Sequence, residues 1–190
     1  MLRYETGQTK SGSFATLEDD KIGFEGGMVG KQQRSDERAG SLGTVVITGA
    51  SRGIGAATAR LAAARGYAIG VNYARGSAEA AAVVREIREA GAEAIQANIA
   101  LEADVVRLFA EAERALGPLT GLVNNAGITG GFARVDAITA EALERLMAVN
   151  VTGSILCARE AVRRMSTRHG GTGGAIVNIS SIAAKDGSGG

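Results

Sequence analysis

A glycine-rich segment that directly follows a short apolar run carries the most specific chemistry in this sequence. Residues 44–47 are Thr-Val-Val-Ile, and such a β-branched run predicts a buried strand of a parallel sheet. The next residues read Thr48-Gly49-Ala50-Ser51-Arg52-Gly53-Ile54-Gly55, and helical spacing then connects Ile54, Ala57, Thr58, Leu61 and Ala62. A strand that turns through a loop poor in side chains into a helix directs backbone N–H groups and the positive end of the helix dipole toward one point.

That arrangement suits the diphosphate of a dinucleotide, because glycine lets the phosphates approach the backbone closely. We therefore predict that a dinucleotide binds here, at Gly49, Ser51, Arg52, Gly53, Ile54 and Gly55. An ordinary tight turn would also use glycine, and 28 glycines in 190 residues make chance matches more frequent. The spacing differs from the G-x-x-x-x-G-K-[ST] loop of nucleotide triphosphatases, and no lysine follows it.

Four segments, taken in order, resemble the motifs of the short-chain dehydrogenase/reductase family. The loop has the family's T-G-x-x-x-G-x-G spacing, and the others are Asn124-Asn125-Ala126-Gly127, Asn150-Val151-Thr152-Gly153 and Ile176-Val177-Asn178-Ile179-Ser180-Ser181. From these motifs, residues 44–184 are identified as a member of that family, and they are similar to its 3-oxoacyl-carrier-protein reductase-like and glucose 1-dehydrogenase-like proteins. The resemblance implies hydride transfer between a nicotinamide dinucleotide and a ketone or secondary alcohol.

Alternating strand and helix patterns from residue 44 onward predict an α/β fold. Strands are expected at residues 44–47, 68–73, 92–99, 119–124 and 175–181, with helical segments between them. Such alternation specifies a doubly wound parallel sheet, Rossmann-like, in the order 3-2-1-4-5, with ligands at the carboxyl ends of the strands. The sixth and seventh strands that the resemblance implies have no counterpart in the sequence.

Apolar stripes predict which helix faces are buried. A helix starting near Ser77, as N-cap, is expected to bury Ala80, Val83, Val84 and Ile87, and the next helix Val105, Leu108, Phe109, Ala112 and Leu116. A long helical region over about residues 139–168 is expected to bury Val151, Ile155, Ala158, Val162 and Met165. Residues 1–42 are polar and aperiodic, which predicts a disordered extension before an incomplete NADP-binding domain at 43–190.

The end of the second strand predicts which dinucleotide binds. An acidic side chain there would bind the ribose 2′-hydroxyl of NAD, but residues 71–75 are Val-Asn-Tyr-Ala-Arg. Arg52 and Arg75 provide two guanidinium groups that could flank a 2′-phosphate, and Tyr73 is included among the cofactor-binding residues. We predict NADP as cofactor, with NADPH bound roughly ten-fold or more tighter than NADH, a gap of ~1.4 kcal/mol. A solvated loop cation is the alternative for Arg75.

The resemblance assigns further roles. Asn98 and Ile99 would hold the adenine, although many relatives carry Asp at the first position, and Asn125, Ala126 and Gly127 would approach the nicotinamide-side ribose. Ser181 would polarise the carbonyl, and Asn150 would hold a water in the proton relay. Asn124 could instead tie neighbouring strands together.

The family's Tyr-x-x-x-Lys motif, which supplies the proton, is not found. Tyr4, Tyr67 and Tyr73 are the only tyrosines, and none has a lysine four residues later. We expect the 190-residue chain to be an N-terminal fragment of an enzyme, and we expect the fragment itself to bind NADP weakly or not at all and to lack reductase activity. A non-catalytic nucleotide-binding module is the alternative.

Composition limits the other functions. Twenty-one basic and 20 acidic side chains nearly cancel, which argues against nucleic acid or an anionic membrane as partner. Arg159, Arg163, Arg164 and Arg168 fit a solvated helix face. No apolar run approaches the ~20 residues that span a bilayer, there is no signal-peptide pattern, and the single Cys157 is typical of a cytoplasmic protein. The small-molecule substrate stays undefined, and the full-length parent is expected to be a homo-oligomer.

Overall fold

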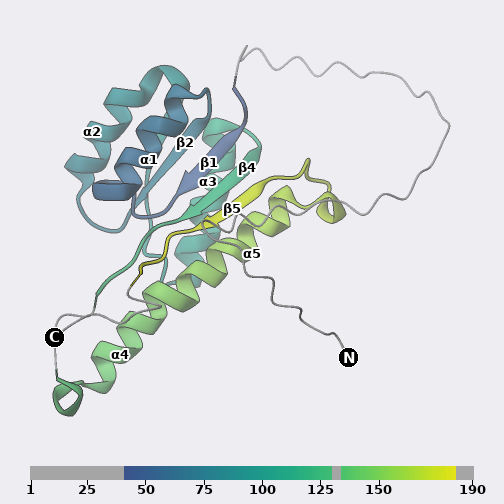
Figure 1. The fold of residues 1–190 in the computed structure, drawn as a ribbon. Helices are drawn as coiled ribbons and strands as arrows, with labels where there is room; N and C mark the ends of the chain where they lie inside the picture. The colour runs from purple at the N-terminus through teal and green to yellow at the C-terminus, as the bar shows by residue number, and fades with distance from the viewer. Residues whose placement is uncertain (1–40, 130–133, 183–190) are drawn as a thin grey trace, which may run out of the picture. The chain divides into compact units, whose positions relative to one another are not determined.

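The computed structural model describes residues 41–129 and 134–182, and these form an α/β fold built on one parallel sheet (Figure 1). The strands are β1 Thr44–Ile47, β2 Ala68–Tyr73, β3 Ala92–Gln96, β4 Leu119–Asn124 and β5 Ala175–Asn178. They lie in the order β3-β2-β1-β4-β5, which confirms the predicted topology. The proposed extension at residues 1–42 lies almost wholly outside the described residues.

Helices cover both faces of the sheet (Figure 1). The α-helices are α1 Gly53–Ala64, α2 Ser77–Ile87, α3 Glu102–Leu116, α4 Ala140–Met147 and α5 Ser154–Met165, and a π-helical segment, Ala148–Gly153, joins α4 to α5. Short 3-10 turns occupy Arg88–Ala90, Val135–Ala137 and Thr167–His169. None of the helices in the described ranges is long and apolar enough to cross a membrane.

Two apolar layers form the core, one on each face of the sheet. Side chains of a strand alternate between faces, so Val46 packs with α3 and α5 while Val45 and Ile47 pack with α1 and α2. Phe109 and Leu108 on α3 are fully buried against the first of these faces. The edge strand β5, which lies beside β4, is less covered, since most of its residues are exposed.

The buried face of α1 consists of small residues and leaves the large apolar side chains outside. Ile54 and Leu61 are 63% and 54% exposed, and the helix packs through Ala56, Ala59 and Ala63 instead. A Cβ on Gly55 would lie only 2.6 Å from the Gly49 carbonyl oxygen, so the helix approaches the loop too closely for large side chains. Small residues therefore face the sheet, and the larger ones face away.

The buried face of α5 corrects part of the prediction: Met165 is buried as predicted, but three other predicted residues are not. The long helical region is present, but Val151, Ile155 and Val162 are 40%, 63% and 45% exposed. The residues that pack inward are Gly153, Cys157, Glu160, Ala161 and Met165. Two apolar stripes run along this helix, and the buried one includes a carboxylate, which the apolar pattern could not anticipate.

Several element ends differ from the sequence boundaries. β3 stops at Gln96 and β5 at Asn178, each three residues before the expected end. The chain leaves β3 because the Asn98 N–H donates to Asp104 Oδ2 at 2.7 Å, which turns the backbone toward α3. Helix α2 is capped by Gly76 in the left-handed region, and Ser77 is its first residue rather than its cap.

The buried carboxylate of Glu160 is neutralised by arginines of its own helix. Its oxygens lie 2.7 Å from Arg164, 2.9 Å from Arg163 and 3.1 Å from Arg159. Arg159 also pairs with Glu102 of α3 at 2.7 Å, so the cluster joins α5 to α3. Arg164 is 17% exposed, so this arginine is not part of a solvated face.

The arginines control the ionisation of Glu160. Burial by itself would raise the pKa of this carboxyl, but the hydrogen bonds from Arg164 and Arg159 and the positive charges around it outweigh burial. Its pKa therefore lies below its ordinary value. A buried ion pair that loses one partner leaves an uncompensated charge, which is costly.

We expect Glu160→Gln to lower the free energy of unfolding by about 3 kcal/mol at pH 7, because the arginines would lose their counter-charge. Since the folded-state pKa is lowered, the contribution is complete above the unfolded value of 4.5 and is lost as pH falls through the folded value. Urea unfolding of both chains across this pH range measures it. As control, Glu111→Gln removes an exposed pair with Arg107 and should cost under about 0.5 kcal/mol. Equal effects of the two substitutions would contradict the assignment.

Candidate functional site

A cleft of about 900 Å³ opens where the carboxyl ends of β1 to β4 meet. Carboxyl ends of parallel strands share one edge of the sheet, so segments far apart in sequence converge there. The predicted residues that line the cleft are Gly49, Ser51, Arg52, Tyr73, Arg75, Asn98, Ile99, Asn125, Ala126 and Gly127. The predicted residues that do not line it are Gly53, Ile54, Gly55, Asn150 and Ser181.

Asn72, near the carboxyl end of β2 and on the cleft wall, anchors the start of the glycine loop. It is buried, and its Oδ1 accepts a hydrogen bond of 3.2 Å from the Gly49 N–H. Its amide nitrogen donates to the carbonyls of Ile95 and Ala97 at 3.3 and 3.1 Å. The loop is thereby tied through β2 to the end of β3. Sequence reasoning missed this role, although a polar residue within an apolar strand was a visible signal.

Thr48 and Asn125 hold the loop against the end of β4. Thr48 Oγ1 accepts hydrogen bonds of 3.0 Å from the N–H groups of Asn125 and Ala126. In return, the Asn125 amide nitrogen donates to the carbonyls of Thr48 at 2.8 Å and Gly49 at 3.1 Å. The Asn125 side chain therefore fixes the backbone of the loop, while the segment that follows it lines the cleft.

Asn124 has the strand-tying role that was weighed for it. Its amide nitrogen donates to Asn178 Oδ1 on β5 at 3.0 Å and to the Ser154 carbonyl at 3.1 Å. It is buried and does not line the cleft. This side chain links β4, β5 and α5.

The first turn of α1 keeps its N–H groups available. Within the described residues, the amides of Gly53, Ile54 and Gly55 donate to no protein acceptor, and Arg52 provides no side-chain cap. A Cβ on Gly53, where φ is +57°, would meet nothing within 4 Å. The loop can therefore present several donors and the helix dipole to an anion without a side chain in the way.

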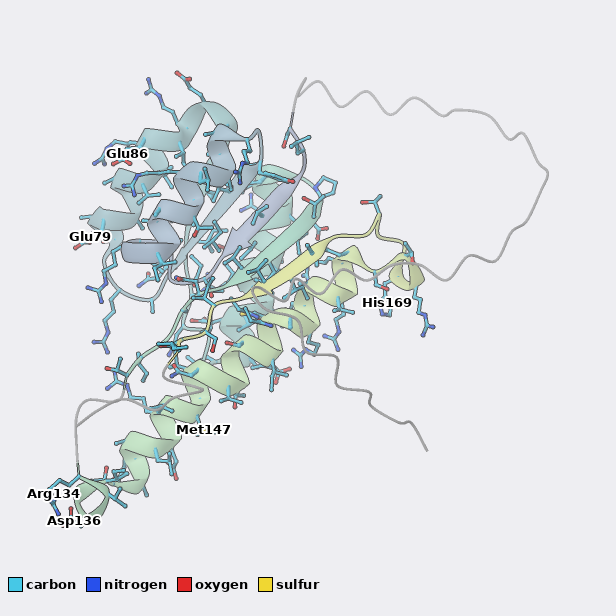
Figure 2. All side chains as sticks on the ribbon, in the orientation of Figure 1. Glu79, Glu86, Arg134, Asp136, Met147 and His169 are labelled. Atoms are coloured by element: carbon cyan, nitrogen blue, oxygen red, sulfur yellow. The ribbon has the colours of Figure 1, made fainter. Side chains whose placement is uncertain are left out.

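Arginines dominate the charge at the cleft. Arg52, Arg75 and Arg145 all line it, and none of them takes part in an ion pair within the described part of the chain. Glu79, labelled on α2 in Figure 2, is the one acidic residue among the lining residues of these ranges. The surplus of positive charge favours an anionic ligand.

The segment after β3 is held in a fixed turn. Asn98 Oδ1 accepts a hydrogen bond of 3.2 Å from the Ala100 N–H, and the Asn98 N–H donates to Asp104. That backbone hydrogen bond, together with one from Arg107, lowers the pKa of Asp104 below its ordinary value. The turn brings Asn98, Ile99 and Ala100 to the cleft wall.

Asn150 and Ser181 lie outside the cleft wall. Asn150, in the π-helical segment, makes two hydrogen bonds to the backbone of Ile128. Its Oδ1 accepts one of 2.8 Å from the Ile128 N–H, and its Nδ2 donates one of 2.7 Å to the Ile128 carbonyl. Ser181 is exposed and follows the end of β5. Further residues line the cleft that the sequence analysis did not predict. They include Ala74, Gly76, Glu79, Ile128, Arg145, Ala148 and Val149.

Residues 43–190 match the family described as short chain dehydrogenase, so the chain belongs to the short-chain dehydrogenase family. "Uncharacterized oxidoreductase YgfF" of Escherichia coli (strain K12) is 46% identical over 149 residues, which cover 77% of this chain and 60% of that protein. "2-(S)-hydroxypropyl-CoM dehydrogenase 3" of Xanthobacter autotrophicus is 41% identical over 140 residues, covering 73% of this chain and 53% of the relative.

Solved structures share the fold. "NADH-dependent reductase A1-R′ complexed with NAD" superimposes with a TM-score of 0.70 at 29% identity, over 78% of this chain and 64% of that one. The "short-chain dehydrogenase/reductase from Serratia marcescens BCRC 10948" gives 0.69 at 32% identity, over 76% and 57%. The chain thus spans 53–64% of the length of these four proteins.

Proposed function

We propose that the chain is the nucleotide-binding part of an NADP-dependent oxidoreductase that interconverts a ketone and a secondary alcohol. The observation that carries the proposal is the glycine loop, whose free helix amides stand at the carboxyl edge of the sheet beside the cleft. Membership in the family supports the reaction class, and one similar structure is titled as a complex with NAD. When bound, a nicotinamide dinucleotide supplies or accepts the hydride.

The residues present fit such a group. The N–H groups at the start of α1 would hold the diphosphate, and Gly53 leaves the approach open. Asn98 and Ile99 would hold the adenine, and Asn125, Ala126 and Gly127 the ribose on the nicotinamide side. The cleft connects the residues proposed for the adenine and the ribose with Gly49, Ser51 and Arg52 of the loop, as an extended dinucleotide would require.

NADP is the proposed form of the cofactor. The end of β2 carries no carboxylate that would bind a 2′-hydroxyl and repel a 2′-phosphate. Arg52 and Arg75 both line the cleft, and so does Tyr73, the last residue of β2, which pairs with Gln96 at the end of β3. Glu79 opposes the phosphate, but the two arginines exceed its single charge.

Ser181 is proposed to polarise the reacting carbonyl, and Asn150 to hold the water of the proton relay. The Asn150 side chain is engaged with Ile128 at both of its polar atoms, and its backbone carbonyl accepts a hydrogen bond of 3.1 Å from Ser154 Oγ, so we assign the water to the remaining lone pair of that carbonyl. No tyrosine in the sequence has a lysine four residues later, so we propose that the 190-residue chain by itself has no reductase turnover. The same observation favours the second candidate, a non-catalytic nucleotide-binding module.

A second copy of the protein is the proposed partner, together with a small carbonyl or alcohol substrate. An exposed apolar stripe runs along α4, the π-helical segment and α5. It consists of Leu143, Met147, Val151, Ile155 and Val162, and Met147 is labelled in Figure 2. Apolar stripes of this length on a helix face mark contact surfaces. A cytoplasmic location is proposed because Cys157 is a buried free thiol, whose pKa burial raises to about 12.

Titration of the 190-residue chain with NADPH and NADH tests the cofactor. We expect NADPH to bind roughly ten-fold tighter, and Arg75→Ala to remove most of that gap by weakening NADPH alone, because only NADPH carries the phosphate. Arg88→Ala, an exposed arginine outside the cleft, is the matched control and should change neither affinity. Equal affinities of the unaltered chain for both dinucleotides would refute the NADP assignment.

Sedimentation measurements test the partner. We expect the chain to self-associate, and Ile155→Glu to leave it monomeric, because a charge would be buried at the centre of the stripe. Leu61→Glu places the same charge at a comparably exposed position on α1 and should leave the mass unchanged. If Ile155→Glu and Leu61→Glu give the same mass as the unaltered chain, the stripe is not the contact surface.

A further inference from the structure

Arg145 is a cleft residue that none of the sequence motifs includes. It lies on α4, one turn before Ala148 and Val149, and these residues form one wall of the cleft. Its side chain is exposed, and no carboxylate lies within ion-pairing distance of it among residues 41–129 and 134–182. A guanidinium that faces a ligand cleft without a protein partner is available for a ligand.

The turn after β3, formed by Asn98, Ile99 and Ala100, also lines the cleft. The π-helical segment packs tightly on this turn, since a Cβ on Gly153 would lie 2.8 Å from the Ile99 carbonyl oxygen. The continuous helical region from α4 to α5, which carries Arg145, is thereby fixed beside Ile99.

This end of the cleft is distinct from the diphosphate loop. β3 is separated from β1 by β2, so its carboxyl end lies about 10 Å from the start of the glycine loop, at two strand spacings. Arg52 and Arg75 belong to the segments that follow β1 and β2. Arg145 belongs to neither of these segments, and it lines the cleft from the helices whose π-helical segment packs on Ile99.

We propose that Arg145 stacks its guanidinium plane on the outer face of the adenine ring. The inference rests on the proposed function, because it names a new contact for the same dinucleotide. Arginine stacks readily on aromatic planes and is less strongly hydrated than lysine, which suits a half-open position at the cleft edge. The inner face of the ring would rest on the apolar surface of Ile99, so the base would be held between this residue and Arg145.

A stacking contact has a consequence that a phosphate contact lacks. NADPH and NADH share the adenine and differ only in the 2′-phosphate. The loss of Arg145 therefore weakens both by the same factor, whereas the loss of Arg75 weakens NADPH alone. The affinity for AMP, which keeps the adenine, falls by the same factor as the affinities for the dinucleotides. The affinity for nicotinamide mononucleotide, which lacks the adenine, does not change.

Ligand-observed NMR titration of the full chain with NADPH, NADH, AMP and nicotinamide mononucleotide tests the proposal. Arg145→Ala is expected to weaken the first three roughly five-fold and leave the fourth unchanged. The control is Glu144→Ala, its exposed neighbour that does not line the cleft, and it should change none of them. Thermal unfolding of both variants checks that α4 stays intact.

Other outcomes overturn the proposal in distinguishable ways. A loss confined to NADPH would make Arg145 a phosphate ligand, and affinities equal to those of Glu144→Ala would mean that it has no ligand contact. Both results would leave the proposed function standing. Failure of the unaltered chain to bind either dinucleotide would instead refute the proposed function, and this inference with it.

Discussion

The hydrogen bonds that fix Gly49 between two strand ends are the constraint on which the site depends. Its N–H is held by Asn72 from β2, and its carbonyl by Asn125 from the end of β4. Thr48 Oγ1 completes the frame because it accepts hydrogen bonds from the N–H groups of Asn125 and Ala126, which follow β4. Each such bond contributes about 1 kcal/mol, but leaving a buried partner unsatisfied costs more, so the loop has one favourable conformation.

From this frame the rest of the site follows by short steps. The fixed loop sets where α1 begins, and the close approach at Gly55 requires alanines on the face of α1 that meets the sheet. The same Asn72 reaches the end of β3, so the loop and the turn at Asn98 are held in one rigid unit. The π-helical segment then packs on Ile99 and brings α4 to the edge of the cleft.

The sequence was sufficient for features that local pattern determines. The β-branched run at residues 44–47 and the alternation of strands and helices gave the sheet and its order, because parallel crossovers allow few topologies. The loop glycines were recognisable because the backbone demands them: φ is positive at Gly49 and Gly53, and neighbouring backbone lies too close for a side chain at Gly49 and Gly55.

Features decided by long-range packing were not predictable in the same way. Both stripes of α5 are apolar enough to be buried, and only the sheet and α3 decide that Cys157 is inside while Ile155 is outside. Glu160 is buried because arginines surround it, a fact that hydropathy alone contradicts. Arg145 lines the cleft from α4, which a π-helical segment joins to α5 in a region that the pattern presents as one helix.

The central claim is that the loop from Gly49 to Gly55 binds the diphosphate of a dinucleotide. Backbone amide resonances of the isotope-labelled chain, followed during titration with NADPH, test it most directly. The account predicts that the largest shifts fall on residues 51–55, whose amides face the anion, with smaller shifts at Asn98 and Ile99. Saturable binding that leaves the amides of 51–55 unmoved, with the shifts concentrated elsewhere, would contradict it.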